Sequence, residues 1–180
     1  TLENEIAAIH ERTDKPFGIN HLLFQTQEDM FAVTLRARPA VAAFAWARKE
    51  QNLHDYFQRA HDAGCKVMHM AGEVAEALRA AEAGVDVLVA QGTEAGGHVG
   101  WMASLPLLPM MVKAVAPLPV LCAGGIADGR GLAAADVDGR EREPVSPRVP
   151  VPGPPSPDDD VQPVGRPALP AFDLHPERRK

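Results

Sequence analysis

Short apolar runs alternate with amphipathic stretches along the first three quarters of the chain. The runs are brief and are bounded by polar or turn-forming residues, which is typical of buried strands. The pattern predicts strands over 17–24, 40–46, 65–71, 85–90 and 119–123. The amphipathic stretches predict helices before Pro16 and over 28–36, 53–63, 73–83 and 107–116. Gly64 and Gly84 follow two of these helices and are expected to end them.

Continuous apolar strands separated by single helices indicate a parallel α/β sheet that is covered on both faces. A doubly wound sheet and a TIM (β/α)8 barrel both have this pattern. Asn20, the segment at Gln91 and Gly124 fall at or near the carboxyl ends of predicted strands, where barrel enzymes place their chemistry. A doubly wound fold usually concentrates its glycines after the first strand. The sequence therefore favours the barrel.

Composition divides the chain into two unlike segments. The 180 residues are 46% hydrophobic and 23% charged, as in a globular protein. Eleven of the 17 prolines nevertheless lie after Arg140. Proline removes donors from strand ladders, so this part cannot form barrel strands. We expect a partial barrel over residues 1–135 and a disordered, proline-rich tail over 136–180.

Charge and cysteine content limit the kinds of binding partner and the cellular location that we expect for the chain. A net charge of −6 without a dense Lys/Arg cluster argues against nucleic acid binding. No apolar run reaches the roughly 18 residues that span a bilayer, so no membrane partner is expected. Cys65 and Cys122 lie in apolar stretches, which favours buried, reduced thiols and a cytoplasmic location, although a disulfide between them stays open. The acidic run at 158–160 has no metal-ligand partners nearby, and no metal site is expected.

Two glycine-rich segments follow predicted strands. The first, Ala-Gln-Gly-Thr-Glu-Ala-Gly-Gly-His, ends at His98 and contains three glycines that let the backbone pass close to a flat ligand. Its simpler interpretation is a flexible loop with a solvent-exposed histidine. The second places Gly124 and Gly125 between a buried strand and a helix. Exposed amides there suit a phosphate, whereas Asp128 is expected to cap the helix.

Several other side chains have plain structural interpretations. Glu94 is expected to face solvent in its loop. His69 lies within a predicted strand and is expected to be a packed, hydrogen-bonded core histidine. His61, like His10 and His54, lies in a predicted helix and is expected to be solvated. Trp46 ends a predicted strand and fits either a substrate pocket or a cap on the barrel.

Taken together, the segments at 13–20, 63–69, 90–98 and 123–132 resemble the signature of the nitronate monooxygenase family over about residues 5–135. The resemblance implies an FMN-containing (β/α)8 barrel that oxidises alkyl nitronates with molecular oxygen. It implies that His98 is catalytic and that the flavin site contains Asn20, Gln91, Gly96, Gly124 and Gly125. An imidazole can accept a proton beside a nitro group, and a protonated one can stabilise an anionic nitronate.

Two alternatives to a nitronate monooxygenase stay open. Related FMN reductases, such as enoyl-acyl-carrier-protein reductase II and NAD(P)H:quinone reductase, share the Gly-Gly-His loop. A non-catalytic remnant is the other alternative, because the resemblance is incomplete at both ends. The family has a further strand before 13–20, and this chain departs from the family pattern after Ala135. A shifted reading frame is one hypothesis for that departure, and we expect the 180-residue chain to fold poorly or to bind FMN weakly.

Overall fold

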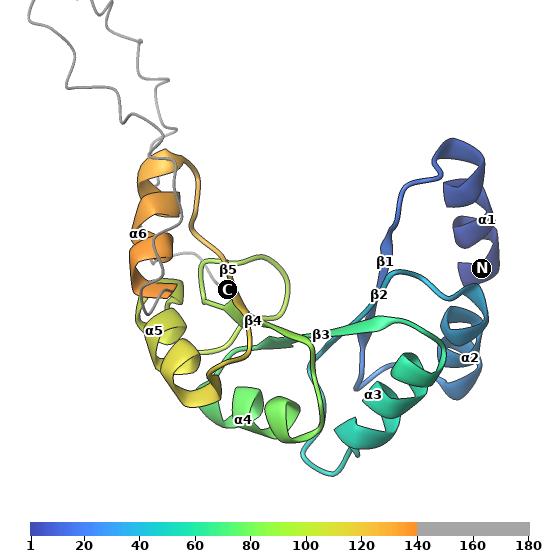
Figure 1. Cartoon of the computed structure of the whole chain (residues 1–180), viewed down its shortest axis with the longest axis horizontal. Coiled ribbons are helices and arrows are strands. Elements are labelled where there is room, and N and C mark those ends of the chain that lie inside the picture. Colours follow the sequence, from blue (N-terminus) through green and yellow to red (C-terminus); the bar gives the residue numbers. More distant parts are fainter. Residues whose placement is uncertain (140–180) are drawn as a thin grey trace, which may run out of the picture. The chain divides into compact units, whose positions relative to one another are not determined.

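The computed structural model describes residues 1–139, which form a five-stranded parallel sheet with its connecting helices (Figure 1). Every strand and helix expected from the hydrophobic pattern overlaps one of the observed elements. In chain order these are α1 (Leu2–Arg12), β1 (Gly18–Leu22), α2 (Glu28–Ala37), β2 (Val41–Ala45), α3 (Leu53–Asp62), β3 (Lys66–Ala71), α4 (Val74–Glu82), β4 (Val87–Gln91), α5 (Ser104–Val115), β5 (Val120–Ala123) and α6 (Gly129–Gly139).

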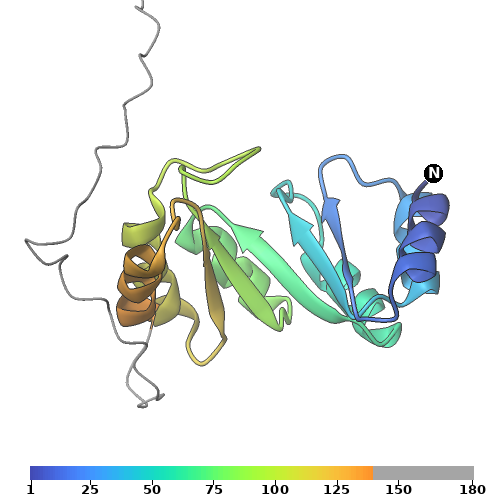
Figure 2. The ribbon, with the colours of Figure 1, turned by 90° about the horizontal axis from the view of Figure 1, so that it is seen from above.

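The order of the strands decides between the two α/β architectures. The spatial order is β1-β2-β3-β4-β5, the same as the order along the chain, and each strand is parallel to the next. A doubly wound sheet would reverse its order at a central strand. A barrel instead adds each strand beside the one before it and keeps its helices outside. Figures 1 and 2 show α2 to α5 on one face of the sheet, so the partial barrel is confirmed.

The hydrophobic core lies between the sheet and these helices. Phe44 of β2 is fully buried, and its ring centroid lies 5.8 Å from that of Phe31 in α2 and 5.4 Å from that of Phe57 in α3. In the sheet, Phe44 is in register with His69, and His69 with Leu88, so these side chains share the helix-covered face. Burying three phenylalanines here ties two helices to the middle of the sheet.

The opposite face of the sheet, which we call the open face, carries a different set of side chains. Asn20, Ala43 and Met68 are neighbours in register on it, and Leu121 of β5 is 52% exposed there. We expected both faces of the sheet to be covered. In the described residues, helices cover one face only. In a barrel the inner face is covered by the strands opposite, which explains why the strands are apolar on both sides.

Local signals at the helix ends behave as the sequence indicates. Gly64 follows α3 with φ +87°, a conformation that L side chains rarely adopt. The Asp128 carboxylate accepts hydrogen bonds from the amides of Arg130 and Gly131, which confirms Asp128 as the cap of α6. Helix α6 continues to residue 139, and the expected disordered tail beyond it lies outside the described residues.

Three further features bear on the expectations from composition. Cys65 and Cys122 are both free; Cys65 is buried and Cys122 half-buried. In residues 1–139, no helix is both long and apolar enough to cross a membrane. The same part of the chain contains no group of three or more His, Cys, Asp or Glu side chains that could hold a metal ion.

Candidate functional site

Most of the residues expected to form a site lie at the carboxyl ends of the strands. Asn20 and Gln91 lie on the open face of β1 and β4, as their register with alternating neighbours shows. Gln91 ends β4, His98 follows it, and Gly124 directly follows β5. Because all five strands are parallel, these three positions belong to one edge of the sheet, whereas Asn20 is the middle residue of β1.

The loop after β4, residues 92–103, is closed by backbone hydrogen bonds. The Thr93 amide donates to the Met102 carbonyl over 3.0 Å, and the Ala95 amide donates to the Gly92 carbonyl over 3.1 Å. The Gln91 side-chain amide also donates to the Gly96 carbonyl, at 3.4 Å. Gln91 and Gly96, both expected at the flavin, are thus neighbours that help to shape the loop.

His98 extends from this loop toward the ends of two other strands. Its ring is exposed, and its centroid lies 5.5 Å from that of Phe24, which follows β1, and 5.7 Å from that of Trp46, which follows β2. The ring is therefore solvent-exposed, as the simpler interpretation expected, but it also has two aromatic neighbours. Phe24 was not among the expected site residues, although an aromatic side chain just after a strand is the signal that could have identified it.

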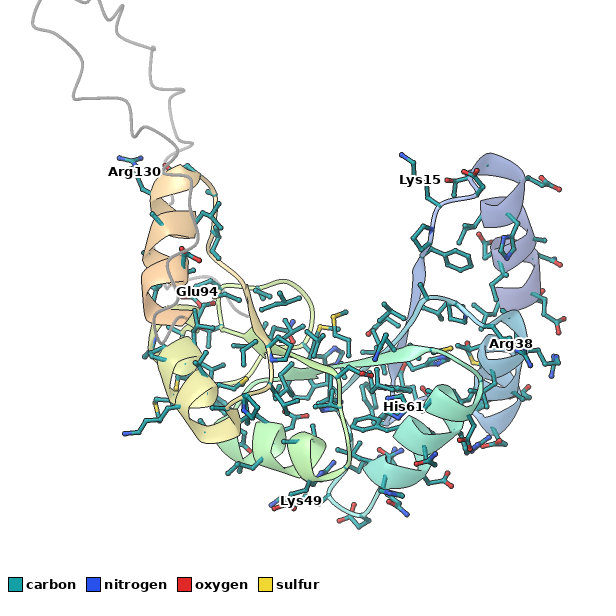
Figure 3. All side chains as sticks on the ribbon, in the orientation of Figure 1. Lys15, Arg38, Lys49, His61, Glu94 and Arg130 are labelled. Atoms are coloured by element: carbon teal, nitrogen blue, oxygen red, sulfur yellow. The ribbon has the colours of Figure 1, made fainter. Side chains whose placement is uncertain are left out.

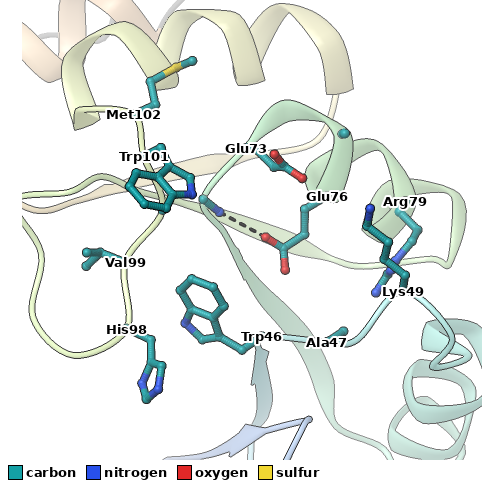
Figure 4. Close-up of a pocket in the computed structure, with 13 residues that line it drawn as sticks. Trp46, Ala47, Lys49, Glu73, Glu76, Arg79, His98, Val99, Trp101 and Met102 are labelled. Atoms are coloured by element: carbon teal, nitrogen blue, oxygen red, sulfur yellow. Dashed lines mark hydrogen bonds between the residues drawn. The ribbon is translucent and has the colours of Figure 1, made fainter.

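An open pocket of about 980 Å³ lies beside His98. Trp46 and Trp101, the two tryptophans of the chain, both line it, as does Glu76 of α4 (Figure 4). Trp46 therefore lines a pocket, and its contact with a substrate stays a prediction. Asn20 and Gln91 do not line this pocket; they lie on the open face of the sheet instead.

Glu76 is fixed against the end of β3. Its carboxylate accepts a hydrogen bond from the Gly72 amide at 3.1 Å and one from His69 Nε2 at 3.3 Å. His69 is fully buried beside Phe57, which confirms it as a packed, hydrogen-bonded core histidine. The buried pair holds one carboxylate in the wall of the pocket.

The turn after β5 has the geometry of an anion site. Gly124 and Gly125 have φ angles of +114° and +73°, and a Cβ at Gly124 would lie 2.8 Å from the Ala95 amide nitrogen. No hydrogen bond is recorded from the amides of Gly125 and Ile126 in the described part of the chain, and α6 begins shortly after them. Uncommitted amides ahead of a helix favour a bound phosphate, so these residues fit the phosphate of a flavin nucleotide.

Glu94 is exposed, as expected, but its carboxylate is also held by hydrogen bonds. It accepts hydrogen bonds from the Ser104 amide at 3.0 Å and from the Ser104 hydroxyl at 3.1 Å, at the start of α5. Bonds from its own amide and from the Ser104 amide lower the pKa of the Glu94 carboxyl. The sequence did not show this contact, because its two partners are ten residues apart and meet only when the loop folds back.

His61 also differs from expectation, at the other end of the sheet. It is only 33% exposed, and its Nε2 lies 2.8 Å from a carboxylate oxygen of Asp86, just before β4. Lys66 and the Val67 amide bind the same carboxylate, each at 2.7 Å. Figure 3 labels His61 and Glu94, which belong to these two opposite ends. Polar clusters at the amino-terminal ends of barrel strands serve stability, so we assign this one no chemistry.

Comparisons with known proteins agree with this geometry. A family model described as nitronate monooxygenase matches residues 27–141. A dehydrogenase of Mycobacterium tuberculosis that is named for a hydroxy-methyl-oxo-octahydroindene-carboxyl-CoA is 40% identical over 141 residues, which cover 75% of this chain and 39% of the relative.

Two solved structures are also similar. FabK from Thermotoga maritima has a TM-score of 0.69 and 34% identity, over 77% of this chain and 43% of that chain. Nitroalkane oxidase from Streptomyces ansochromogenes has a TM-score of 0.66 and 25% identity, over 77% of this chain and 51% of that chain. The chain thus spans about half, or less, of the length of these relatives.

Proposed function

The chain belongs to the nitronate monooxygenase family, and from this premise we propose that it carries the FMN and substrate site of an oxidoreductase that oxidises alkyl nitronates with molecular oxygen. The observation that carries the proposal is the position of His98. Its ring stands beside Trp46 in the wall of a pocket, at the strand edge that also contains the Gly124–Gly125 turn. A proton-transferring group and an anion-binding turn at one edge are what a flavin oxidoreductase of this kind requires.

Each expected site residue has a role under this proposal. The turn amides at Gly124 and Gly125 would hold the FMN phosphate. Asn20 and Gln91, on the open face, would contact the flavin ring system, with the Gly96 carbonyl beside Gln91. FMN would supply electron transfer from the substrate to oxygen, which is chemistry that no side chain of this chain can provide.

His98 is proposed to act on the substrate. As a neutral imidazole it can accept a proton from the carbon next to a nitro group. As an imidazolium it can stabilise the negative charge of a nitronate. The rings of Phe24 and Trp46, whose centroids lie 5.5 Å and 5.7 Å from that of His98, limit its movement. We further propose that residues 1–135 form the FMN-binding unit, while the cytoplasmic location stays a prediction.

A second candidate function is favoured by one of the relatives. The M. tuberculosis dehydrogenase, which is named for a carboxyl-CoA substrate, is 40% identical over three quarters of this chain. A flavin dehydrogenase or reductase that acts on a thioester-linked substrate is therefore the alternative.

Oxygen and NADH consumption separate these functions. The purified chain is supplied with FMN and ethyl nitronate, and oxygen uptake is followed with an electrode. We expect nitronate-dependent uptake that falls by roughly 10²–10⁴-fold in His98→Asn, because a general acid–base group is lost. The control is His54→Asn, which changes an exposed histidine of α3. NADH consumption without a nitronate would instead support a reductase, and bound FMN without either activity would contradict both enzymatic proposals.

A further inference from the structure

The loop after β4 and the turn after β5 meet at a single point, at the start of α5. Glu94 belongs to the loop, Ser104 begins α5, and Ala123 ends β5 directly before the glycine pair. Ser104 is 2% exposed, so this meeting point is buried at its centre although Glu94 lies at the surface. Three separate segments of the chain are thus joined through one small side chain.

Hydrogen bonds connect all three segments. The Glu94 carboxylate accepts from both the amide and the hydroxyl of Ser104, and the same hydroxyl lies 3.1 Å from the Ala123 carbonyl. A hydroxyl has one proton, so it donates to the carboxylate or to the carbonyl at any moment. The amide bond to Glu94 persists in either case. The hydroxyl therefore links the loop to β5 through a shared proton.

The glycines at this point leave no room for side chains. A Cβ added to Gly92 would lie 2.1 Å from the Ser104 hydroxyl oxygen, and one added to Gly124 would lie 2.9 Å from the same atom. A Cβ at Gly125 would lie 3.3 Å from Cβ of Glu94. The glycines of both segments are thus in direct contact with the Glu94–Ser104 pair, and displacement of one segment must disturb the other.

We propose that Glu94 is a positioning residue that, through Ser104, holds the His98 loop and the Gly124–Gly125 turn as one unit. The loop presents the proton-transferring histidine and the turn presents the phosphate-binding amides, so their spacing is fixed by a carboxylate that touches neither ligand. The catalytic meaning of this linkage rests on the proposed function, whereas the linkage itself does not.

An ordinary helix cap is the competing explanation. A carboxylate at a helix N-terminus stabilises that helix by itself. A cap would protect the first turn of α5 and would leave the amides of β5 (120–123) unaffected, since the cap bond itself ends at the Ser104 amide. The two explanations therefore differ in what happens at β5, which leads directly into the Gly124–Gly125 turn.

Amide hydrogen exchange of the purified chain at pH 7, without added flavin, tests the proposal. In Glu94→Ala we expect exchange to rise by about tenfold or more both in 93–98, where the Thr93 and Ala95 amides are hydrogen-bonded, and in β5 (120–123), while the central strands β2 and β3 keep their protection. Glu94→Gln should restore most of the protection, because its amide oxygen can still accept from the Ser104 amide. Glu73→Ala is the matched control, since Glu73 precedes α4 without a side-chain cap hydrogen bond.

Other exchange patterns would overturn the proposal. Faster exchange in 93–98 and α5 alone would show that Glu94 acts only as a helix cap. An equal rise in exchange through every strand would show that Glu94 only stabilises the whole fold. If Glu94→Ala does not fold, Ser104→Ala replaces it. That variant removes the hydroxyl link to Ala123 but keeps the amide, so exchange should rise in β5 (120–123) more than at 93–98, and the reverse order would contradict the linkage.

A separate titration with FMN distinguishes failure of the proposed linkage from failure of the proposed function. Coupled exchange in a chain that does not bind FMN would support the linkage and contradict the flavin site. If FMN does bind, its affinity should fall by about tenfold or more in Glu94→Ala and much less in Glu94→Gln. Equal affinities in the parent chain and both variants would contradict the positioning role.

Discussion

His98 takes its position from residues that are far apart in the sequence. Its loop is closed by Thr93 and Met102, and its ring packs beside Phe24 and Trp46, which follow β1 and β2. A histidine near glycines is a weak signal in a sequence. It becomes a candidate acid–base group here because three segments, its own loop and the ends of β1 and β2, meet around it.

Asp86 is the residue whose environment makes the clearest prediction about stability. Burial raises the pKa of its carboxyl, but hydrogen bonds from Lys66, the Val67 amide and His61 outweigh this and lower the pKa to about 2. A lowered pKa contributes stability above the unfolded value, near 4, and this contribution is lost as the pH falls toward 2. Because solvent screens the exposed partner Lys66, Asp86→Asn should cost about 1 kcal/mol at pH 7, less than the full shift corresponds to.

Urea unfolding of the parent chain and Asp86→Asn between pH 7 and pH 3 measures this effect. The difference in the free energy of unfolding should stay constant down to about pH 5 and shrink below about pH 4. Asp62→Asn, which affects an exposed pair with Gln58, is the control and should change little. A difference that is independent of pH would show that the carboxylate charge does not stabilise the fold.

At the scale of elements, the two faces of the sheet carry different kinds of side chain. The helix-covered face holds the fully buried side chains, such as Phe44, whereas the open face carries Asn20 and Gln91 and leaves Leu121 half exposed. Stability and site chemistry are therefore assigned to opposite faces of the same strands. The two-residue repeat of a strand makes this separation possible.

Two truncations test this separation. Phe44→Ala should destabilise the chain by about 3–5 kcal/mol, because it leaves a cavity between β2 and both α2 and α3. Leu121→Ala, on the open face, should cost less than about 1.5 kcal/mol, since the leucine is already 52% exposed. Urea midpoints at constant m-value measure both changes. Similar costs for the two variants would show that the open face is as tightly packed as the helix-covered one.

Much of the fold at this scale could be predicted from the sequence, and less of the site. The apolar runs and the glycines at 64 and 84 indicated the elements, because these signals are local. The strand order could not be read from local signals, because it depends on which strands pair, such as β1 with β2 and β4 with β5. The contacts of Glu94 with Ser104 and of His61 with Asp86 were missed for the same reason, since each joins positions ten or more residues apart.

At the scale of the whole molecule, residues 1–139 supply five successive parallel strands of a barrel architecture that uses eight. The expected site residues belong to the carboxyl edge of these strands, except Asn20 in the middle of β1, and the ionic cluster around Asp86 belongs to the amino edge. This division between a functional and a stabilising edge is general in barrel enzymes. It supports the view that the described part of the chain carries the cofactor site of its family.

Binding of FMN to the purified chain tests this central claim most directly. Titration followed by flavin fluorescence should show saturable one-to-one binding, and riboflavin, which lacks the phosphate, should bind about tenfold or more weakly. Gly124→Ala should weaken FMN binding, because a Cβ there would strike the loop of His98, whereas Gly129→Ala, which has open space, should not. Absence of saturable binding, or equal affinities for FMN and riboflavin, would contradict the flavin site.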